Sequence, residues 1–151
     1  MPEASITVRR ATREDVDVVA PLFDAYRQFY GQPPALQLAR EFVSQRLERA
    51  ESIVLLAQSP AAALGFCQLY PSFSSVALGR VFILNDLFVA HEHRRLGVGA
   101  ALLRAATDYG RSEGAVRITL STAVTNAAAR TLYEASGWVR QTDYHVYSLR
   151  P

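Results

Sequence analysis

Hydrophobic positions along the chain follow two periods, which predict a mixture of strands and helices. Alternating residues, or short apolar runs between turn residues, predict strands. The expected strands are 6–10, 52–58, 63–70, 80–90, 116–121, 138–139 and 144–149. Apolar residues three and four positions apart predict helices. The expected helices carry Val16 to Tyr26, Leu38 to Leu47, Val98 to Tyr109 and Ala127 to Ser136. This mixed order around one sheet predicts an α+β domain.

Cap and turn residues delimit these helices. Thr12 precedes an acidic turn and is the expected N-cap of the first helix. Gly31 and Pro33–Pro34 end that helix. Asn126 precedes the last helix, and Gly137 stands in its C′ position, where a left-handed residue commonly ends a helix.

The segment Arg80–Ala90 is nearly continuous in apolar residues and follows an expected connection at Pro71–Ser75. Such a run predicts a central strand buried on both faces. Only Asn85 and Asp86 interrupt it, and a polar pair there must be hydrogen-bonded or open to a cleft. Because neighbouring strand residues point to opposite faces, only one of the two is expected to face a given site.

Composition narrows the class of protein. The chain has 151 residues, a usual length for one domain, so a single domain over 1–151 is expected. Sixteen basic residues nearly balance fourteen acidic ones, which argues against nucleic acid or a membrane as a partner. The lone Cys67 excludes an internal disulfide, and no apolar run predicts a signal peptide or a membrane-spanning helix. A cytoplasmic protein is therefore expected.

A glycine-bearing loop, Arg94–Gly99, joins the apolar strand to the helix that follows. Glycines let the backbone turn sharply and let a ligand approach closely. The first amide protons of a helix lack partners inside it, and with the helix dipole they attract phosphate. Arg94 and Arg95 can add charged donors. The pattern predicts an anion site, although a tight turn with solvated arginines would have the same spacing.

Two other phosphate-binding loops fit this segment less well. A dinucleotide fingerprint requires a small residue where Leu102 stands. A Walker loop requires Lys and then Ser or Thr after Gly99, where Ala100 and Ala101 stand. Nothing in the loop would hold magnesium.

The loop resembles the acetyl-CoA-binding motif of the GNAT superfamily of N-acetyltransferases, which reads Arg or Gln, two residues, Gly, one residue, Gly or Ala. The segments 85–89 and 100–103 are similar to the family too, as is 126–138 with its Leu132-Tyr133-Glu134 triplet. The resemblance is strong from Arg80 to Trp138 and weaker in Pro21 to Leu47. It implies a GNAT-like single domain, with a mostly antiparallel, splayed sheet of about six to seven strands and about four helices.

The resemblance also implies which residues bind acetyl-CoA. Backbone amides of the loop would hold the pyrophosphate, and the strand edge would pair with the pantetheine arm. An amide of that edge would polarise the acetyl carbonyl. The residues expected to bind acetyl-CoA are Leu87, Phe88, Val89, Arg94, Arg95, Leu96, Gly97, Val98, Gly99, Ala100, Asn126 and Tyr133.

Acetyl transfer to an amine needs a base and an acid. From the residues alone, Tyr133 is expected to be a packed core tyrosine. The resemblance implies instead that Tyr133 gives a proton to, or hydrogen-bonds, the departing thiolate. Asn85 and Asp86 are the other expected catalytic residues. The diamine acetyltransferases carry Glu-Asp at this position, and Asn85 cannot act as a base. Asn85 is expected to orient a water or the amine, and Asp86 to bind a cationic substrate or to be a buried structural acceptor.

The resemblance implies that the first two helices shape the acceptor pocket. The expected substrate contacts are Tyr26 and Tyr30, whose rings can stack on an amine, and Asp86, which can bind a cation. The histidines have no spacing that predicts a metal site. The leading interpretation is an enzyme that moves acetyl from acetyl-CoA directly to a primary amine of a small molecule or amino acid. The alternatives are a protein lysine or N-terminal acetyltransferase and a non-catalytic CoA-binding sensor. The resemblance also allows a homodimer, since many such folds pair through their last strands.

Overall fold

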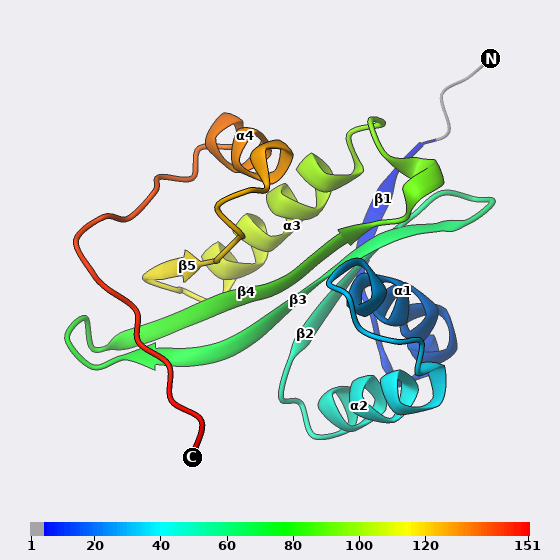
Figure 1. Cartoon of the computed structure of the whole chain (residues 1–151), viewed down its shortest axis with the longest axis horizontal. Coiled ribbons are helices and arrows are strands. Elements are labelled where there is room, and N and C mark those ends of the chain that lie inside the picture. Colours follow the sequence, from blue (N-terminus) through cyan, green and yellow to red (C-terminus); the bar gives the residue numbers. More distant parts are fainter. Residues whose placement is uncertain (1–4) are drawn as a thin grey trace. The chain divides into compact units, whose positions relative to one another are not determined.

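A five-stranded sheet forms the frame of the larger part of the chain (Figure 1). The computed structural model describes residues 5–151, which divide by their contacts into a unit that ends at Ser121 and a second unit, Thr122–Pro151. The strands lie in the order β1-β2-β3-β4-β5, and their bounds are Thr7–Arg10, Ile53–Gln58, Ala63–Ser74, Gly79–Val89 and Arg117–Thr119. The first three pairings are antiparallel, and β4 pairs with β5 in parallel.

Helices cover both faces of this sheet. On one face lie α1 (Val16–Phe29) and α2 (Leu36–Glu48), and on the other lies α3 (Val98–Ser112), the crossover between β4 and β5 (Figure 1). Because side chains alternate along a strand, Leu56 and Phe66 pack in one core with α1, while Phe82 meets Tyr109 of α3 with ring centroids 5.4 Å apart.

Thr12 is an N-cap as predicted, but of a short 3₁₀ turn that leads into α1, and polar contacts join α1 to α2. The Thr12 hydroxyl accepts from the Glu14 amide, and the Asp15 carboxylate accepts from the Thr12 amide, which is a capping box before the short 3₁₀ turn Arg13–Asp15. The buried Asp24 carboxylate then accepts from the Ala35 amide (3.0 Å), next to the first residue of α2. This bond fixes the start of α2 to the middle of α1.

The second unit contains α4 (Ala127–Ala135), with the predicted caps at both ends. The Asn126 side-chain oxygen accepts from the Ala129 amide at 3.1 Å. At the other end, Gly137 is left-handed (φ 90°), its amide donates to Glu134, and the Trp138 amide donates to Tyr133. These two bonds form a Schellman motif, and the contact of the Tyr133 and Trp138 rings accompanies it.

The connection predicted at Pro71–Ser75 is wrong, because β3 continues through Ser74. Beyond Leu69, β4 is the only neighbour of β3 among residues 5–151, since the pairing with β2 ends at Ile53–Leu69. A proline is tolerated on an edge strand because its missing N–H removes no ladder bond on the open side. Pro71 therefore pairs with Phe82 without breaking the strand.

The predicted number of six to seven strands is also too high, since the described residues form five. The segments 138–139 and 144–149 form no strand, and 116–121 is a strand only at Arg117–Thr119. A preference for β residues makes a strand only where a neighbouring strand supplies ladder bonds and packing. The α+β class and the mostly antiparallel sheet with four α-helices are confirmed.

Candidate functional site

A β-bulge in β4 decides where its two polar residues lie. In the ladder with β3, Gln68 is opposite Asp86 and Leu69 is opposite Leu84, so Asn85 is one extra residue. Leu84 lies on the α3 face with Leu69, whereas Asp86 lies on the α1 and α2 face with Gln68. The bulge thus shifts the alternation of β4 by one residue.

The bulge corrects two predictions about β4. Asn85 and Asp86 were expected to face different sites, yet both line one pocket, because a bulge breaks the strict alternation of a strand. The strand was also expected to be buried on both faces. Instead, Ile83 is 39 % exposed and Asn85 is exposed, because α1 and α2 cover only part of their face.

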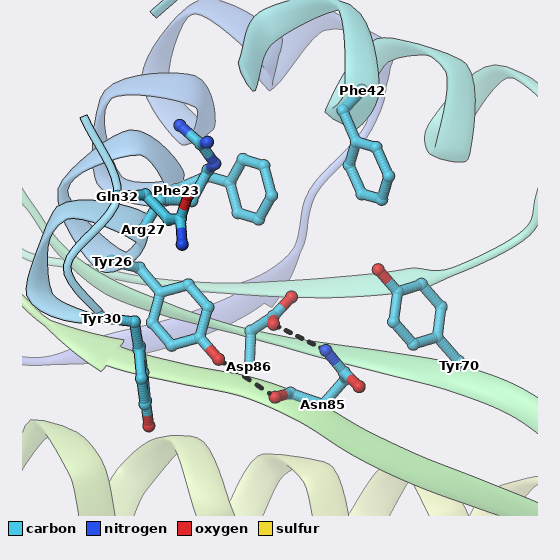
Figure 2. A pocket seen from close by; sticks show the side chains of 9 residues that line it. All are labelled: Phe23, Tyr26, Arg27, Tyr30, Gln32, Phe42, Tyr70, Asn85 and Asp86. Atoms are coloured by element: carbon cyan, nitrogen blue, oxygen red, sulfur yellow. Dashed lines mark hydrogen bonds between the residues drawn. The ribbon is translucent and has the colours of Figure 1, made fainter. Parts of the chain in front are cut away.

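The pocket lies between β3, β4 and the first two helices, and five of its nine lining residues are aromatic (Figure 2). We call it the aromatic pocket; its volume is about 290 Å³. Its lining residues are Phe23, Tyr26, Arg27, Tyr30, Gln32, Phe42, Tyr70, Asn85 and Asp86. The structure therefore brings together the three predicted substrate contacts, Tyr26, Tyr30 and Asp86.

Asp86 is the buried acid of the aromatic pocket, only 3 % exposed. Its carboxylate accepts hydrogen bonds from the Gln68 amide and, at 2.9 Å, from the Asn85 amide. Burial raises the pKa of Asp86 above its usual value, although bonds from Gln68, Asn85 and Tyr26 act in the opposite direction. A carboxylate in this state is a better proton acceptor than a solvated one.

Two tyrosines lie on either side of Asp86 (Figure 2). The Tyr26 hydroxyl donates to the backbone oxygen of the bulged Asn85 at 3.2 Å, which holds α1 against the bulge. Tyr70 comes from β3, and burial together with the charge of Asp86 raises the pKa of its phenol to about 12. Tyr70 is therefore a neutral donor and acceptor throughout the physiological range.

One edge of β4 has no partner strand. Pairing with β5 ends at Ile83–Thr119, so within residues 5–151 no strand pairs with Leu84–Val89 on the side opposite β3. We call this the free edge; it contains Leu87, Phe88 and Val89, the residues predicted to pair with pantetheine. Exposed strand edges bind extended ligands through their main-chain groups.

The glycine loop, Arg94–Gly99, follows β4 and has the backbone of an anion site. Arg95 and Gly97 have positive φ values of 63° and 82°, and successive amides in such conformations form an anion-binding concavity. The first helical bond of α3 is from Ala101 to Gly97, and no side chain in the described chain caps this end. The amides of Gly97 to Ala100 thus fit a diphosphate.

Arg94 has a structural role that its position in the motif did not reveal. Its Nε–H donates to the Val89 oxygen at 3.0 Å. Its guanidinium lies over the rings of Phe29 and Phe88, 5.6 and 5.7 Å from their centroids. Arg94 therefore joins the loop to the end of α1 and to the end of β4, and this is the only hydrogen bond of its side chain recorded among the described residues.

In the second unit, Tyr133 and Asn126 are both held by the caps of α4. Asn126 uses its side-chain oxygen to cap the helix, and Tyr133 packs its ring near Trp138 with centroids 6.3 Å apart. These contacts fix the direction of both side chains relative to α4.

The acetyltransferase (GNAT) family matches residues 19–138. The chain belongs to this family. The GNAT family uses acetyl-CoA, so this protein is a member of an acetyl-CoA-dependent enzyme family. The match includes β4, the glycine loop and α4, and it confirms the family named from the motif.

Relatives of this GNAT protein support the assignment over nearly the whole chain. The uncharacterized N-acetyltransferase YhfO of Bacillus subtilis is 45 % identical over 95 % of this chain and 97 % of its own. An aminoglycoside N(6')-acetyltransferase of Klebsiella aerogenes is 31 % identical over 65 % of this chain and 66 % of its own. A crystal structure of a probable acetyltransferase is 44 % identical, covers 96 % of this chain and 97 % of its own, and superposes with a TM-score of 0.91.

Three further features of the GNAT protein concern a metal site, a membrane-spanning helix and a cysteine nucleophile. Within residues 5–151, no three His, Cys, Asp or Glu side chains come close enough to hold a metal ion, and no helix has the length and apolarity to cross a bilayer. The buried Cys67 lies on the α3 face of the sheet, away from the aromatic pocket. Burial and the charge of Asp86 raise the pKa of its thiol to about 12, so it is no thiolate nucleophile at neutral pH.

Several pocket residues were not predicted as site residues. Phe23 and Phe42 were assigned to helix cores, and Gln68 carried no signal because nothing in the sequence pairs it with Asp86. Tyr70 was expected as the last residue of the strand 63–70. The helical spacing of Phe23, Tyr26 and Tyr30 does place them along one side of α1, which could have identified Phe23.

Proposed function

We propose that this protein transfers the acetyl group of acetyl-CoA directly to the primary amine of a small molecule or an amino acid. The observation that carries the proposal is that β4 serves both substrates. Asp86 in this strand lines the aromatic pocket, the free edge runs along Leu84–Val89 of the same strand, and the glycine loop follows after the short 3₁₀ turn His91–His93.

On the donor side, the proposal assigns the pyrophosphate of acetyl-CoA to the amides of Arg95 to Ala100. The pantetheine arm pairs with the free edge, where a backbone N–H polarises the acetyl carbonyl. Support comes from the left-handed Gly97, the uncapped start of α3 and the absence of a β5 partner along Leu84–Val89 in the described chain. Asn126 is assigned to the pantetheine arm.

On the acceptor side, the amine nitrogen attacks the thioester carbonyl carbon. Collapse of the tetrahedral intermediate breaks the C–S bond and gives the N-acetyl amine and CoA. An amine that binds as an ammonium first loses one proton and becomes a nucleophile. On acetylation the nitrogen loses a second proton, the CoA sulfur gains one, and the remaining proton passes to solvent. Asp86 is the proposed proton acceptor, because its burial raises its pKa toward that of an amine. Asn85 orients Asp86, and Tyr133 is the proposed proton donor to the sulfur.

The first experiment follows free CoA, with products identified by mass, during incubation with acetyl-CoA and a panel of amines. The panel contains polyamines, amino acids, aminoglycosides, arylalkylamines and lysine peptides. Turnover that falls sharply in Tyr133→Phe but not in Tyr144→Phe, a tyrosine that does not belong to the proposed site, supports the assignment. A protein that does not bind acetyl-CoA contradicts the proposal.

The same experiment separates the alternatives. Acetylation of lysine peptides in preference to every small amine would favour a protein acetyltransferase. Saturable acetyl-CoA binding without any turnover would favour a CoA-binding sensor. We further propose that both units form one N-acetyltransferase domain, 1–151, because the family match at 19–138 spans the boundary between them.

A further inference from the structure

We propose that the acceptor is a compact amine with a single positive charge on a flat apolar body, of the arylalkylamine class. The inference rests on the proposed function, since it concerns the acceptor of the same reaction. It follows from the charges, the walls and the size of the aromatic pocket, each of which is independent of the others.

The aromatic pocket offers one negative charge to a ligand. Among its nine lining residues, Asp86 is the only acid and Arg27 is the only base. The Arg27 guanidinium is paired with the buried Asp24 at 3.2 Å, so Asp24 is already neutralised and does not attract a ligand. A first ammonium group therefore meets Asp86. A second one would meet no carboxylate and would approach Arg27, which makes a polycation a poor ligand.

The walls of the aromatic pocket are rings that hold one another in place. Phe23 and Phe42 are stacked with centroids 5.5 Å apart, and Tyr26 and Tyr30 meet edge to face at 5.0 Å. Tyr30 and Phe42 are nevertheless 52 % and 38 % exposed, so an apolar body in the pocket would cover ring surface that water now contacts. A flat hydrocarbon or aromatic skeleton fits these walls, and a hydroxyl-rich sugar does not.

The size of the pocket fits the same class. About 290 Å³ lies just below the range of roughly 300–1,000 Å³ that holds drug-sized ligands. A ring with a short amine chain would fill it. An aminoglycoside or a folded peptide segment would extend well beyond its nine residues.

Tyr70 and Asp86 orient the amine within this pocket. Figure 2 shows the Tyr70 hydroxyl directed into the space between Phe42 and Asp86, and no hydrogen bond of this hydroxyl is recorded among the described residues. Its oxygen can accept one N–H of the ammonium while the carboxylate accepts another. The apolar body then lies against Tyr26, Tyr30 and Phe42.

The test compares amines that differ in one feature at a time. 2-Phenylethylamine, 1,4-diaminobutane, kanamycin and a capped lysine peptide are each titrated calorimetrically into the protein saturated with CoA, and kcat/KM is measured for each with acetyl-CoA. We expect 2-phenylethylamine to bind and react about tenfold better than the other three. Phe42→Ala should raise the KM for 2-phenylethylamine about tenfold and leave the KM for acetyl-CoA unchanged.

A variant with an added negative charge, which should change the preference between amines, sharpens the test. Gln32→Glu adds a second carboxylate to the pocket wall, and Gln45→Glu adds the same charge to α2 outside the pocket. Only Gln32→Glu should raise kcat/KM for 1,4-diaminobutane relative to 2-phenylethylamine. A wild-type preference for the diamine, kanamycin or the peptide would overturn the inference while leaving the acetyltransferase intact. No acetylation of any amine, with acetyl-CoA bound, would instead overturn the proposed function, and calorimetry of the amines would still decide the ligand class.

Discussion

The glycine loop and the aromatic pocket are the two halves of the proposed site. They come from different parts of the chain and offer different groups to a ligand. The glycine loop is contiguous, consists of Arg94–Gly99 and offers backbone amides to a ligand. The aromatic pocket is assembled from α1, α2, β3 and β4 and offers side chains. Backbone groups are the same in every protein of the fold, whereas side chains can change without changing the fold. In the proposed assignment, the donor would be selected by local conformation and the acceptor by tertiary packing.

The strongest test of this comparison is Asp86→Asn. We expect kcat/KM for the amine to fall by about 10²–10⁴-fold, because a general base is lost, while the Kd for acetyl-CoA is unchanged. Asp108→Asn, on the exposed side of α3, is the matched control and should have wild-type kinetics. An equal loss of acetyl-CoA affinity in Asp86→Asn would mean that the two halves are not separable.

Asp86 also predicts how stability and activity depend on pH. Its pKa is raised by burial, so between the ordinary aspartate pKa and this raised value the folded protein binds more protons than the unfolded one. The contribution of Asp86 to stability is therefore fully present at low pH and is lost as the pH rises through the folded-state pKa. The rate with the amine should rise over the same interval.

The measurement is chemical denaturation and kcat/KM across this interval for the wild type and Asp86→Asn. The asparagine variant should be at least as stable as the wild type at pH 8, because no charge is buried and the Gln68 and Asn85 amides can turn to pair with it. A variant that is less stable at pH 8 than the wild type would contradict the raised pKa.

Gly97→Ala tests the backbone half of the site. A left-handed alanine costs about 1–2 kcal/mol, and an added Cβ would contact nothing within 4 Å, so the effect is conformational. We expect acetyl-CoA affinity to fall about tenfold, as if one hydrogen bond to a charged group were lost. Gly114→Ala has the same positive φ and the same open space after α3. It should show a similar stability loss with unchanged acetyl-CoA affinity.

Arg94→Lys tests whether the glycine loop depends on its contacts with α1 and β4. Lysine keeps the positive charge but loses the Nε–H bond to Val89 and the planar stacking on Phe29 and Phe88. We expect about three- to tenfold weaker acetyl-CoA binding, because the glycine loop loses the hydrogen bond and the ring contacts that hold it against β4 and α1. Phe29→Leu should have a smaller effect in the same direction. If Arg94 acted only as a charge for the phosphates, the lysine variant would bind acetyl-CoA like the wild type.

Thr12→Ala should have the smallest effect on function. Loss of the capping box is expected to cost about 1 kcal/mol of folding stability, measured by denaturation, because the Thr12 side chain caps the 3₁₀ turn that leads into α1. Its kinetic constants with both substrates should not change, since Thr12 belongs to neither half of the site. A change in the KM for the amine would show that the start of α1 helps to shape the aromatic pocket.

Local signals in the sequence determined much of this protein. The N-cap at Thr12 and the C′ glycine at Gly137 each follow from a few adjacent residues, and each was predicted where the structure has it. The sequence also predicted a sharp turn at the glycines of Arg94–Gly99, where Gly97 has a left-handed conformation. The loop motif, together with the segments 85–89, 100–103 and 126–138, suggested the GNAT family, which the match at 19–138 confirms.

Tertiary structure alone decided the acceptor half and the extent of the sheet. A bulge is visible only in the register between two strands, so the sequence could not place Asn85 and Asp86 together or set Gln68 opposite Asp86. Pro71 looked like a turn because an edge strand can be recognised only once its neighbours are known. The last apolar segments form no strand for the same reason: pairing depends on residues distant in the chain, and periodicity reports only on residues that are near.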